Sequence, residues 1–370
     1  MDLSVRKSDL LRELQFFQGV IERKNTIPIL ANVLVEAGSD DTLKLLATDL
    51  ELGLRSECKA SVKKPGELTL PAKKLFEIVR ELPETDIRIK QDGDKDQVTI
   101  TADQFKSKIQ TLPKTDFPAV PTPTGTNQVL LPRKELHVMI SRTQFAITGE
   151  DTRYFLNGAL FVLKTDSMDL VATDGHRLAL ATTPRESKDI EETRTIFPRK
   201  TLIELSRLLA DSDSKEISYE CGENHLFFKV DGRELISRMI DAQFPAFERV
   251  IPKGNDKKIE FDRDRLTSAI KRVRLLSSER SQAVRMRLSD DQVQVRSESA
   301  EVGEATEELA VNYGDGAVEI CFNAQYVLDF LAAIDTDSVV LELKDEMSQA
   351  VMHPAGEEAT YTYVIMPMRV

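Results

Sequence analysis

The feature that most constrains this chain is an internal repeat. The sequence Leu-Ala-Thr-Asp-Leu-Glu-Leu at residues 46–52 has a counterpart in Val-Ala-Thr-Asp-Gly-His-Arg-Leu at residues 171–178, and the two Thr-Asp pairs lie 125 residues apart. The second copy predicts a strand that runs into a tight turn at Asp174 and Gly175, because Asp-Gly tolerates the positive φ of a hairpin turn. Such an interval predicts that other parts of the chain repeat as well.

Other markers recur at nearly the same interval. Pro71 and Pro198 each precede an apolar stripe, and proline is favoured at the first position of a helix. They lie 127 residues apart. Three copies of one unit therefore account for nearly the whole chain. Further pairs at the spacing of 127 are Phe117-Pro118 with Phe244-Pro245, Leu112 with Met239, and Met239 with Met366.

Each copy is expected to contain a helix, strands, a second helix and further strands, with the third copy the most diverged. Proline- and glycine-bearing connectors at residues 118–125 and 252–255 separate the copies. The predicted fold class is α+β, with repeated domains at residues 1–124, 128–252 and 253–370. Apolar spacing predicts helices at residues 7–24, 71–82, 132–147, 198–211, 263–276 and 323–334, and strands at 29–37, 43–54, 87–90 and 98–101.

Composition bounds the class of protein. A chain of 370 residues with 41% hydrophobic and 30% charged residues is typical of folded domains and excludes a disordered or fibrous chain. Its three cysteines are far apart, which predicts neither a disulfide framework nor a metal site of the Cys-x-x-Cys type. A charged N-terminus and the lack of any long apolar run predict a soluble, cytoplasmic protein.

Charge is distributed unevenly. The net charge of −12 disfavours a simple nucleic-acid binder, because phosphate affinity depends on cationic side chains. Counted over residues 7–24, 71–82, 132–147, 198–211, 262–275 and 323–335, the six expected helices nevertheless carry 18 basic and 12 acidic residues. A surface built from these helices would be basic and suited to phosphate contacts without sequence preference. The alternative is that these Lys and Arg side chains only solvate helix faces, and the last helix, with two acids and no bases, does not fit the cationic interpretation.

Several motifs together resemble one bacterial family. Besides the repeat, they are Arg153-Tyr154-Phe155-Leu156-Asn157-Gly158, the stretch from Ala172 to Ala179, Phe244-Pro245, and Tyr363-Val364-Ile365-Met366-Pro367-Met368-Arg369. With them, essentially the whole chain resembles the bacterial DNA polymerase III beta sliding clamps.

This resemblance implies a closed ring. Two three-domain subunits would join head to tail as a homodimer and enclose duplex DNA, with helices lining the hole of a six-domain ring and sheets outside. Such a processivity factor tethers the replicative polymerase and other replication and repair proteins to DNA, catalyses nothing and needs no cofactor. The implied partners are double-stranded DNA, a second copy of the chain, the DNA polymerase III alpha subunit, the clamp-loader delta subunit and other proteins with a clamp-binding motif. No membrane is implied.

The resemblance also implies which residues form the partner-binding and DNA-binding sites. A hydrophobic pocket between the second and third domains would accept short linear motifs, with methionines adapting to different side chains and arginines meeting acidic or carbonyl groups. The pocket would comprise Leu156, Thr173, Gly175, His176, Arg177, Leu178, Pro245, Arg249, Val250, Val364, Met366, Pro367, Met368 and Arg369. The DNA-facing positions would be Lys24, Lys73, Arg153, Tyr154 and Phe155, with Arg199 and Lys200 as neighbours.

Two positions depart from the family pattern. Glu150 stands where relatives have an uncharged polar residue, so it is left out of the DNA-facing set. Subunit closure would use Ile109 on one edge and Leu275 and Leu276 on the other, but Ser107 replaces a large apolar residue at the first edge. Leu275 and Leu276 could equally be core residues at the end of a helix.

Other classes of function remain as alternatives. A hydrolase using Asp174 and His176 lacks support from any nucleophile, metal or phosphate motif, and the four histidines show no metal-ligand spacing. His176 alone could be a hydrogen-bonded structural histidine. A repeat scaffold that binds only proteins would keep the pocket without the DNA.

Overall fold

The computed structural model describes residues 1–21, 26–91, 93, 96–149, 151–185, 191–357 and 360–369. It divides into two compact units. Unit 1 comprises residues 1–137 and 200–239, and unit 2 comprises residues 138–199 and 240–370. The middle part of the chain thus contributes to both units, and the domain limits expected from the sequence stay predictions.

Unit 1 is built on one antiparallel sheet of 12 strands. Its main path runs β8-β7-β6-β1-β4-β16-β15-β14-β9, and β3 pairs with β4 while β2 pairs with β3 and β5. The elements of the first copy are β1 (Asp2–Arg6), α1 (Lys7–Val20), η1 (Pro28–Ala31), β2 (Asn32–Ala37), β3 (Thr42–Thr48), β4 (Leu52–Lys64), β5 (Gly66–Pro71), α2 (Ala72–Glu81), β6 (Asp86–Gln91), β7 (Gln97–Ala102), β8 (Phe105–Gln110) and η2 (Lys114–Asp116). The later strands of this sheet are β9 (Gln128–Pro132), β14 (Glu216–Cys221), β15 (His225–Val230) and β16 (Arg233–Arg238).

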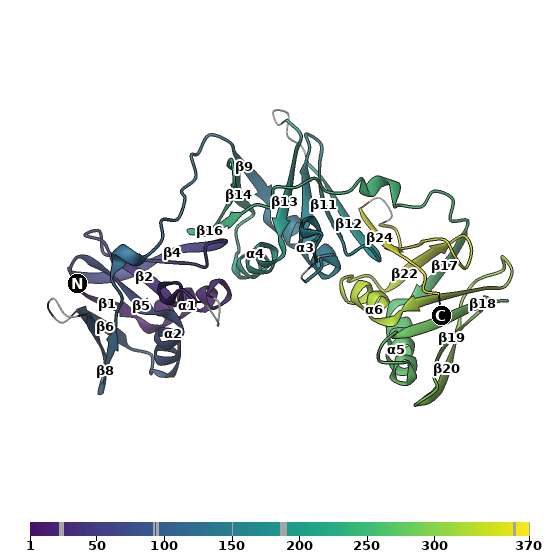
Figure 1. The fold of residues 1–370 in the computed structure, drawn as a ribbon, viewed down its shortest axis with the longest axis horizontal. Helices are drawn as coiled ribbons and strands as arrows, with labels where there is room; N and C mark the ends of the chain where they lie inside the picture. The colour runs from purple at the N-terminus through teal and green to yellow at the C-terminus, as the bar shows by residue number, and fades with distance from the viewer. Residues whose placement is uncertain are drawn as a thin grey trace. The chain divides into compact units, whose positions relative to one another are not determined.

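The helices of unit 1 form where the apolar stripe predicts them. In α1, Leu10, Leu14 and Phe17 are fully buried, because helical spacing places them on one face. That face packs against β4 and against α2, whose own Leu75 and Val79 are buried (Figure 1). Each such side chain contributes roughly 1.5–3 kcal/mol on burial.

Unit 2 contains two antiparallel sheets. The larger has eight strands in the order β13-β10-β11-β12-β24-β23-β22-β17, and the smaller has four in the order β20-β19-β18-β21. The elements of unit 2 from the middle of the chain are η3 (Gln144–Ala146), η4 (Tyr154–Leu156), β10 (Gly158–Leu163), β11 (Ser167–Thr173), β12 (Arg177–Pro184), β13 (Thr193–Pro198) and η5 (Phe247–Arg249). The helix α3 (Arg133–Thr143) is divided between the two units, and α4 (Arg199–Asp211) belongs to unit 1 except for Arg199. The elements of the last copy are β17 (Lys257–Asp262), α5 (Arg263–Val273), η6 (Arg274–Leu276), β18 (Ala283–Ser289), β19 (Gln292–Ser299), β20 (Gly303–Ala310), β21 (Val318–Asn323), α6 (Ala324–Ala332), β22 (Ser338–Leu343), β23 (Ala350–Pro354) and β24 (Tyr361–Ile365).

Some expected boundaries were wrong. Residues 29–31 form a short 3-10 helix rather than a strand, because Pro28 fixes φ and lacks an N–H, which suits the first position of a helical turn. The helices expected at 132–147 and 263–276 end at Thr143 and Val273, and one 3-10 turn continues each of them. The expected end of the first helix lies outside the described residues.

The repeat is visible in how the copies join. The third strand after the first helix of a copy pairs with the last strand of the following copy: β4 pairs with β16, and β12 pairs with β24. A sheet therefore continues from one copy into the next. Within the described part of the chain, β8 and β20 occupy the corresponding places but pair on one side only, with β7 and β19, so both are sheet edges.

Candidate partner-binding site

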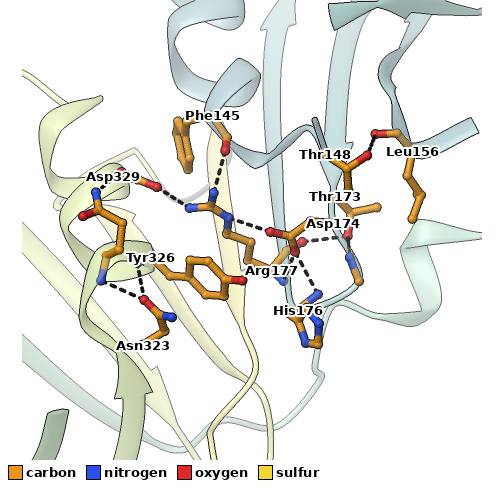
Figure 2. A network of polar contacts seen from close by, with 12 residues as sticks. Phe145, Thr148, Leu156, Thr173, Asp174, His176, Arg177, Asn323, Tyr326 and Asp329 are labelled. Carbon is orange, nitrogen blue, oxygen red and sulfur yellow. Dashed lines mark hydrogen bonds and ion pairs between the residues drawn. The ribbon is translucent and has the colours of Figure 1, made fainter. Parts of the chain in front are cut away.

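The site is organised by the turn at residues 173–177, between β11 and β12 (Figure 2). The Thr173 hydroxyl donates to the Arg177 carbonyl at 2.6 Å and accepts from the Gly175 amide at 3.1 Å. One Asp174 oxygen accepts from the amides of His176 and Arg177 at 2.9 and 3.0 Å. Gly175 has φ of +89°, the left-handed conformation that glycine adopts readily. The tight turn expected at Asp174 and Gly175 is confirmed.

Arg177 lies behind this turn with its side chain only 9% exposed. Its Nε donates to Asp174 at 3.0 Å, Nη1 to Asp329 of α6 at 2.6 Å, and Nη2 to the Phe145 carbonyl at 2.6 Å (Figure 2). The guanidinium also lies over the Tyr326 ring, 4.2 Å from its centroid, which adds a cation–π attraction. The buried charge is thus paired and hydrogen-bonded, as burial of an ion requires.

The Arg177 network bears on one expectation. The sequence suggested that Arg177 meets acidic or carbonyl groups of a bound peptide, but each of its three nitrogens already donates within the chain. Asp329, whose acidic helix did not fit a cationic surface, is one of the acceptors. Arg177 thus links the second and third copies through these bonds, and its role in a peptide pocket stays a prediction.

The apolar part of the site is the junction of β12 with β24. Leu178 is directly opposite Val364 in this pairing, and both are buried in one hydrophobic cluster. Val250 and Phe155 are partly buried against that cluster. Two strands distant in sequence and the segment after β16 thus share one apolar surface. The other buried members of the cluster are Leu160, Val162, Val171, Ile196, Phe247 and Val351.

The C-terminal segment, residues 366–369, runs on from β24 along the 173–177 turn. The Met366 amide donates to the His176 carbonyl at 3.0 Å, and the Met368 amide donates to the Cys321 carbonyl at 2.7 Å. Met366, Pro367, Met368 and Arg369 line a cavity of about 200 Å³. Glu346, Met347 and Gln349 complete its wall. Nothing in the sequence pointed to these three residues, which follow β22 in a loop without a repeated motif.

The remaining expected pocket residues vary in exposure. Gly175, His176, Pro245 and Arg249 are exposed. Leu156 is buried, and its carbonyl accepts from the Thr148 amide and hydroxyl at 3.2 and 2.9 Å. The exposed residues therefore offer backbone, imidazole and guanidinium groups beside an apolar floor.

The residues expected to face DNA lie in both units. In unit 1, Lys73 is exposed on α2, and Lys200 forms an ion pair with Asp49 and donates to the Val20 carbonyl at 3.2 Å. Lys200 is thus already neutralised by a carboxylate. Lys24, like Glu150, lies outside the described residues.

In unit 2, Arg153 is exposed but donates to both oxygens of Asp151, at 3.0 and 2.7 Å. The Arg153 hydrogen bond lowers the pKa of Asp151 to about 2, so this carboxylate stays ionised at neutral pH. Tyr154 is 58% exposed, and Arg199 at the start of α4 is also exposed. Arg153 would have to exchange a carboxylate for a phosphate on contact with DNA.

The residues expected to close the subunit interface lie on two edges. Ile109 is half-buried on β8, while the buried Ser107 hydroxyl on the same strand has no hydrogen-bond partner among the described residues. On η6, Leu275 is 72% exposed and Leu276 is half-buried. The alternative that Leu275 is a core residue is therefore wrong.

Within the described ranges, no helix has both the length and the apolar character to span a bilayer. These ranges also hold no group of three or more His, Cys, Asp or Glu side chains that could ligate a metal ion.

Comparison with known proteins decides the family. Family models for the N-terminal, central and C-terminal domains of the DNA polymerase III beta subunit match residues 1–121, 130–246 and 248–369. The chain belongs to the DNA polymerase III beta subunit family.

Relatives and solved structures of the beta subunit family agree with this assignment. The beta sliding clamps of Pseudomonas putida and Escherichia coli K12 are 36% and 34% identical to the chain, each match covering 100% of both sequences. The crystal structure of the DNA polymerase III subunit beta from Pseudomonas aeruginosa superimposes with a TM-score of 0.94 at 35% identity, covering 100% of both chains. A clamp from Bartonella birtlesii bound to griselimycin gives the same TM-score at 34% identity and the same coverage.

Membership of the beta subunit family fixes the fold and the general function. The expected fold class, three repeated α+β domains of the clamp type, is confirmed. The chain is a DNA sliding clamp, a non-catalytic processivity factor, so the hydrolase alternative is excluded.

Proposed function

We propose that two copies of the chain close head to tail into a ring around duplex DNA and that the site on β12, β24 and residues 366–369 binds short peptide motifs. The DNA polymerase III alpha subunit and the clamp-loader delta subunit are the partners proposed for this site. The domains are assigned to residues 1–124, 128–252 and 253–370, as the sequence predicts. The protein acts in the cytoplasm, where its DNA lies.

Ring closure is supported by the two edge strands. The β4–β16 and β12–β24 pairings join successive copies, and by the same rule β20 would pair with β8 of a second copy. The two edges have complementary charge, with Lys106 and Lys108 exposed on β8 and Glu304 and Glu308 exposed on β20. A contact between different surfaces of two subunits is heterologous and closes only if the rotation completes a ring. Ile109, Leu275 and Leu276 supply the apolar part of the proposed interface.

The peptide site is supported by a combination of apolar floor and polar rim. Leu178 and Val364 form the floor, and His176, Arg249 and Arg369 are exposed around it. An extended peptide needs apolar pockets for a few side chains and polar groups for its backbone. The adaptable methionines of the C-terminal segment suit a site shared by several partners.

The DNA-facing set is proposed as Lys24, Lys73, Arg153, Tyr154, Phe155, Arg199 and Lys200. Weak contacts suit such a role, because enclosure keeps the ring on DNA while tight phosphate contacts would slow its movement. The ion pairs of Arg153 and Lys200 with Asp151 and Asp49 keep those contacts weak.

The test measures retention on DNA after loading by a clamp loader. We expect the protein to stay on a nicked circular plasmid through gel filtration and to be lost once the plasmid is linearised. A variant lacking residues 366–370 should still dimerise but should not be loaded. Equal retention on circular and linear DNA would contradict enclosure, and normal loading of the truncated variant would contradict the proposed peptide site.

A further inference from the structure

The last helix carries an acid that does not fit a cationic surface. Asp329 is on α6, which contains no basic residue. One oxygen of its carboxylate accepts from Nη1 of Arg177 at 2.6 Å (Figure 2), and the other accepts from Nε2 of Gln325, also at 2.6 Å. Gln325 lies four residues before Asp329, so the two side chains meet on one face of the helix. Both oxygens of this carboxylate are therefore bound within the protein.

Asp329 restrains the guanidinium of Arg177 from the side of the third copy. Two further acceptors, Asp174 and the Phe145 carbonyl, come from the second copy. The guanidinium also lies 4.2 Å from the ring centroid of Tyr326 and 5.3 Å from that of Phe145. Because a guanidinium is planar, acceptors at three nitrogens and rings beside it favour one orientation. Loss of Asp329 would remove both a hydrogen bond and a negative charge that hold this orientation.

The orientation of Arg177 is passed on to the turn at residues 173–177. Its Nε donates to one Asp174 oxygen at 3.0 Å, while the other oxygen accepts from the amides of His176 and Arg177 at 2.9 and 3.0 Å. The His176 carbonyl in turn accepts from the Met366 amide at 3.0 Å, and Met366 lines the cavity of about 200 Å³. Hydrogen bonds thus continue from α6 through the turn to the C-terminal segment.

The equivalent turn in the first copy has a simpler connection. There the aspartate, Asp49, pairs with the ammonium group of Lys200. An ammonium is a compact charge with three rotatable donors, so it neutralises the carboxylate without imposing a plane. The oriented pair of Arg177 and Asp329 is found at the turn that carries the candidate partner-binding site.

We propose that Asp329 is a positioning residue of the partner-binding site, which acts through Arg177 to hold the turn at residues 173–177 in the conformation that a peptide meets. This inference rests on the proposed peptide site. Ordering the turn in advance removes that cost from binding. A site whose competent conformation is only partly populated binds more weakly by that fraction. The acid on α6 is thereby explained by partner binding rather than by contact with DNA.

The test is binding of the clamp-loader delta subunit to the full-length protein, measured by surface plasmon resonance. Asp329→Ala should raise the dissociation constant about tenfold, mainly through slower association, because fewer free molecules have the ordered turn. Asp329→Asn keeps an oxygen for Arg177 and should lose only about threefold. Asp335→Ala is the matched control, since Asp335 is an exposed acid just after α6 and its loss changes the net charge equally. It should change the dissociation constant less than twofold.

A double variant separates positioning from direct contact with the partner. Adding Asp329→Ala to Arg177→Met should weaken binding less than twofold further, because a residue that acts through Arg177 has no effect in its absence. A further tenfold loss would mean that Asp329 acts without Arg177 and would overturn the proposal.

Hydrogen exchange of the unbound protein tests the same point without Arg177→Met. The amides of His176 and Arg177 should exchange faster in Asp329→Ala, while those of Glu51 and Leu52 in the first turn stay unchanged. Unchanged exchange at His176 and Arg177 would overturn the positioning role.

The binding measurement also distinguishes this role from the site itself. A parent that binds the delta subunit, with Asp329 variants that bind equally well, would overturn the positioning role and leave the peptide site intact. A parent that does not bind the delta subunit would overturn the peptide site and the positioning role together. So would a variant lacking residues 366–370 that binds the delta subunit as tightly as the parent.

Discussion

The turn at residues 48–52 in unit 1 and the turn at residues 173–177 in unit 2 have the same hydrogen bonds between side chains and backbone. In the first, the Thr48 hydroxyl donates to the Leu52 carbonyl at 2.9 Å and accepts from the Leu50 amide at 3.0 Å. One Asp49 oxygen accepts from the amides of Glu51 and Leu52 at 2.9 and 2.6 Å. Each of these bonds has its counterpart at Thr173 and Asp174 in the second turn.

The two turns differ in the cation that pairs with the second carboxylate oxygen of the aspartate. Asp49 pairs with Lys200, which is on α4 and 151 residues away. Asp174 pairs with Arg177 of its own turn, and Arg177 then reaches Asp329 on α6. Both arrangements tie a turn to the second helix of the following copy. A threonine and an aspartate therefore determine the turn, and the other three positions are free to become specialised.

Replacing the cation should give the largest difference in stability loss between the two turns. Arg177→Met leaves Asp174 and Asp329 facing each other without a positive charge, and loss of one member of a buried ion pair costs about 3–5 kcal/mol. Lys200→Met should cost less, about 1–3 kcal/mol, because water reaches the Lys200 side chain, which is 32% exposed, although the Asp49 side chain that loses its cation is only 4% exposed. Hydrogen exchange at each turn, together with urea unfolding, measures both losses.

The control for these cation variants is the distant turn within the same protein. Exchange at residues 48–52 should stay unchanged in the Arg177 variant, and exchange at residues 173–177 should stay unchanged in the Lys200 variant. Equal losses in the two variants would mean that burial of the cation does not distinguish the turns.

Removing the threonine hydroxyl should instead affect both turns alike. Thr48→Val and Thr173→Val each lose one bond to a carbonyl and leave one amide without its acceptor, which costs about 1–2 kcal/mol. Thr→Ser substitutions at the same positions keep both bonds and are the matched controls. Thermal unfolding of the four variants makes the measurement. A clear difference between the two valine variants would show that the turns differ in more than their cations.

Local signals explain what the sequence predicted well. The stripe of Leu10, Leu14 and Phe17 predicts a buried helical face because its spacing is set by helix geometry alone. The turn at Asp174 and Gly175 was predictable for the same reason, since Asp-Gly chemistry acts within four residues. The threefold repeat extended these local predictions to the whole fold.

Long-range pairing explains what the sequence missed. The partner of Arg177, Asp329, lies 152 residues further along the chain on a helix that looked unsuited to any cationic role. Lys200, which is proposed to face DNA, also pairs with Asp49, and nothing near either residue in the sequence links the two. The cavity wall at Met347 and Gln349 is likewise formed by a loop that only the tertiary fold brings to the C-terminal segment.

The smallest expected effect concerns the residue at the tip of each turn. Leu50 has φ of +80° and Gly175 has φ of +89°, so both positions require a left-handed backbone. A non-glycine residue in this conformation destabilises the folded state by about 1–2 kcal/mol. Glycine removes this strain but makes the unfolded chain more flexible, which offsets part of the gain. Leu50→Gly should therefore stabilise unit 1 by about 0.5 kcal/mol.

The reverse change at the second turn should destabilise unit 2. Gly175→Ala adds the backbone strain of about 1 kcal/mol, and its Cβ would lie 3.1 Å from an Arg153 nitrogen, which can move because it ends a flexible side chain. Opposite signs for the two substitutions in thermal unfolding would show that the repeat imposes the conformation and only the second copy has the residue suited to it. Destabilisation by Leu50→Gly would instead mean that the half-exposed Leu50 side chain contributes more by its contacts than its backbone costs.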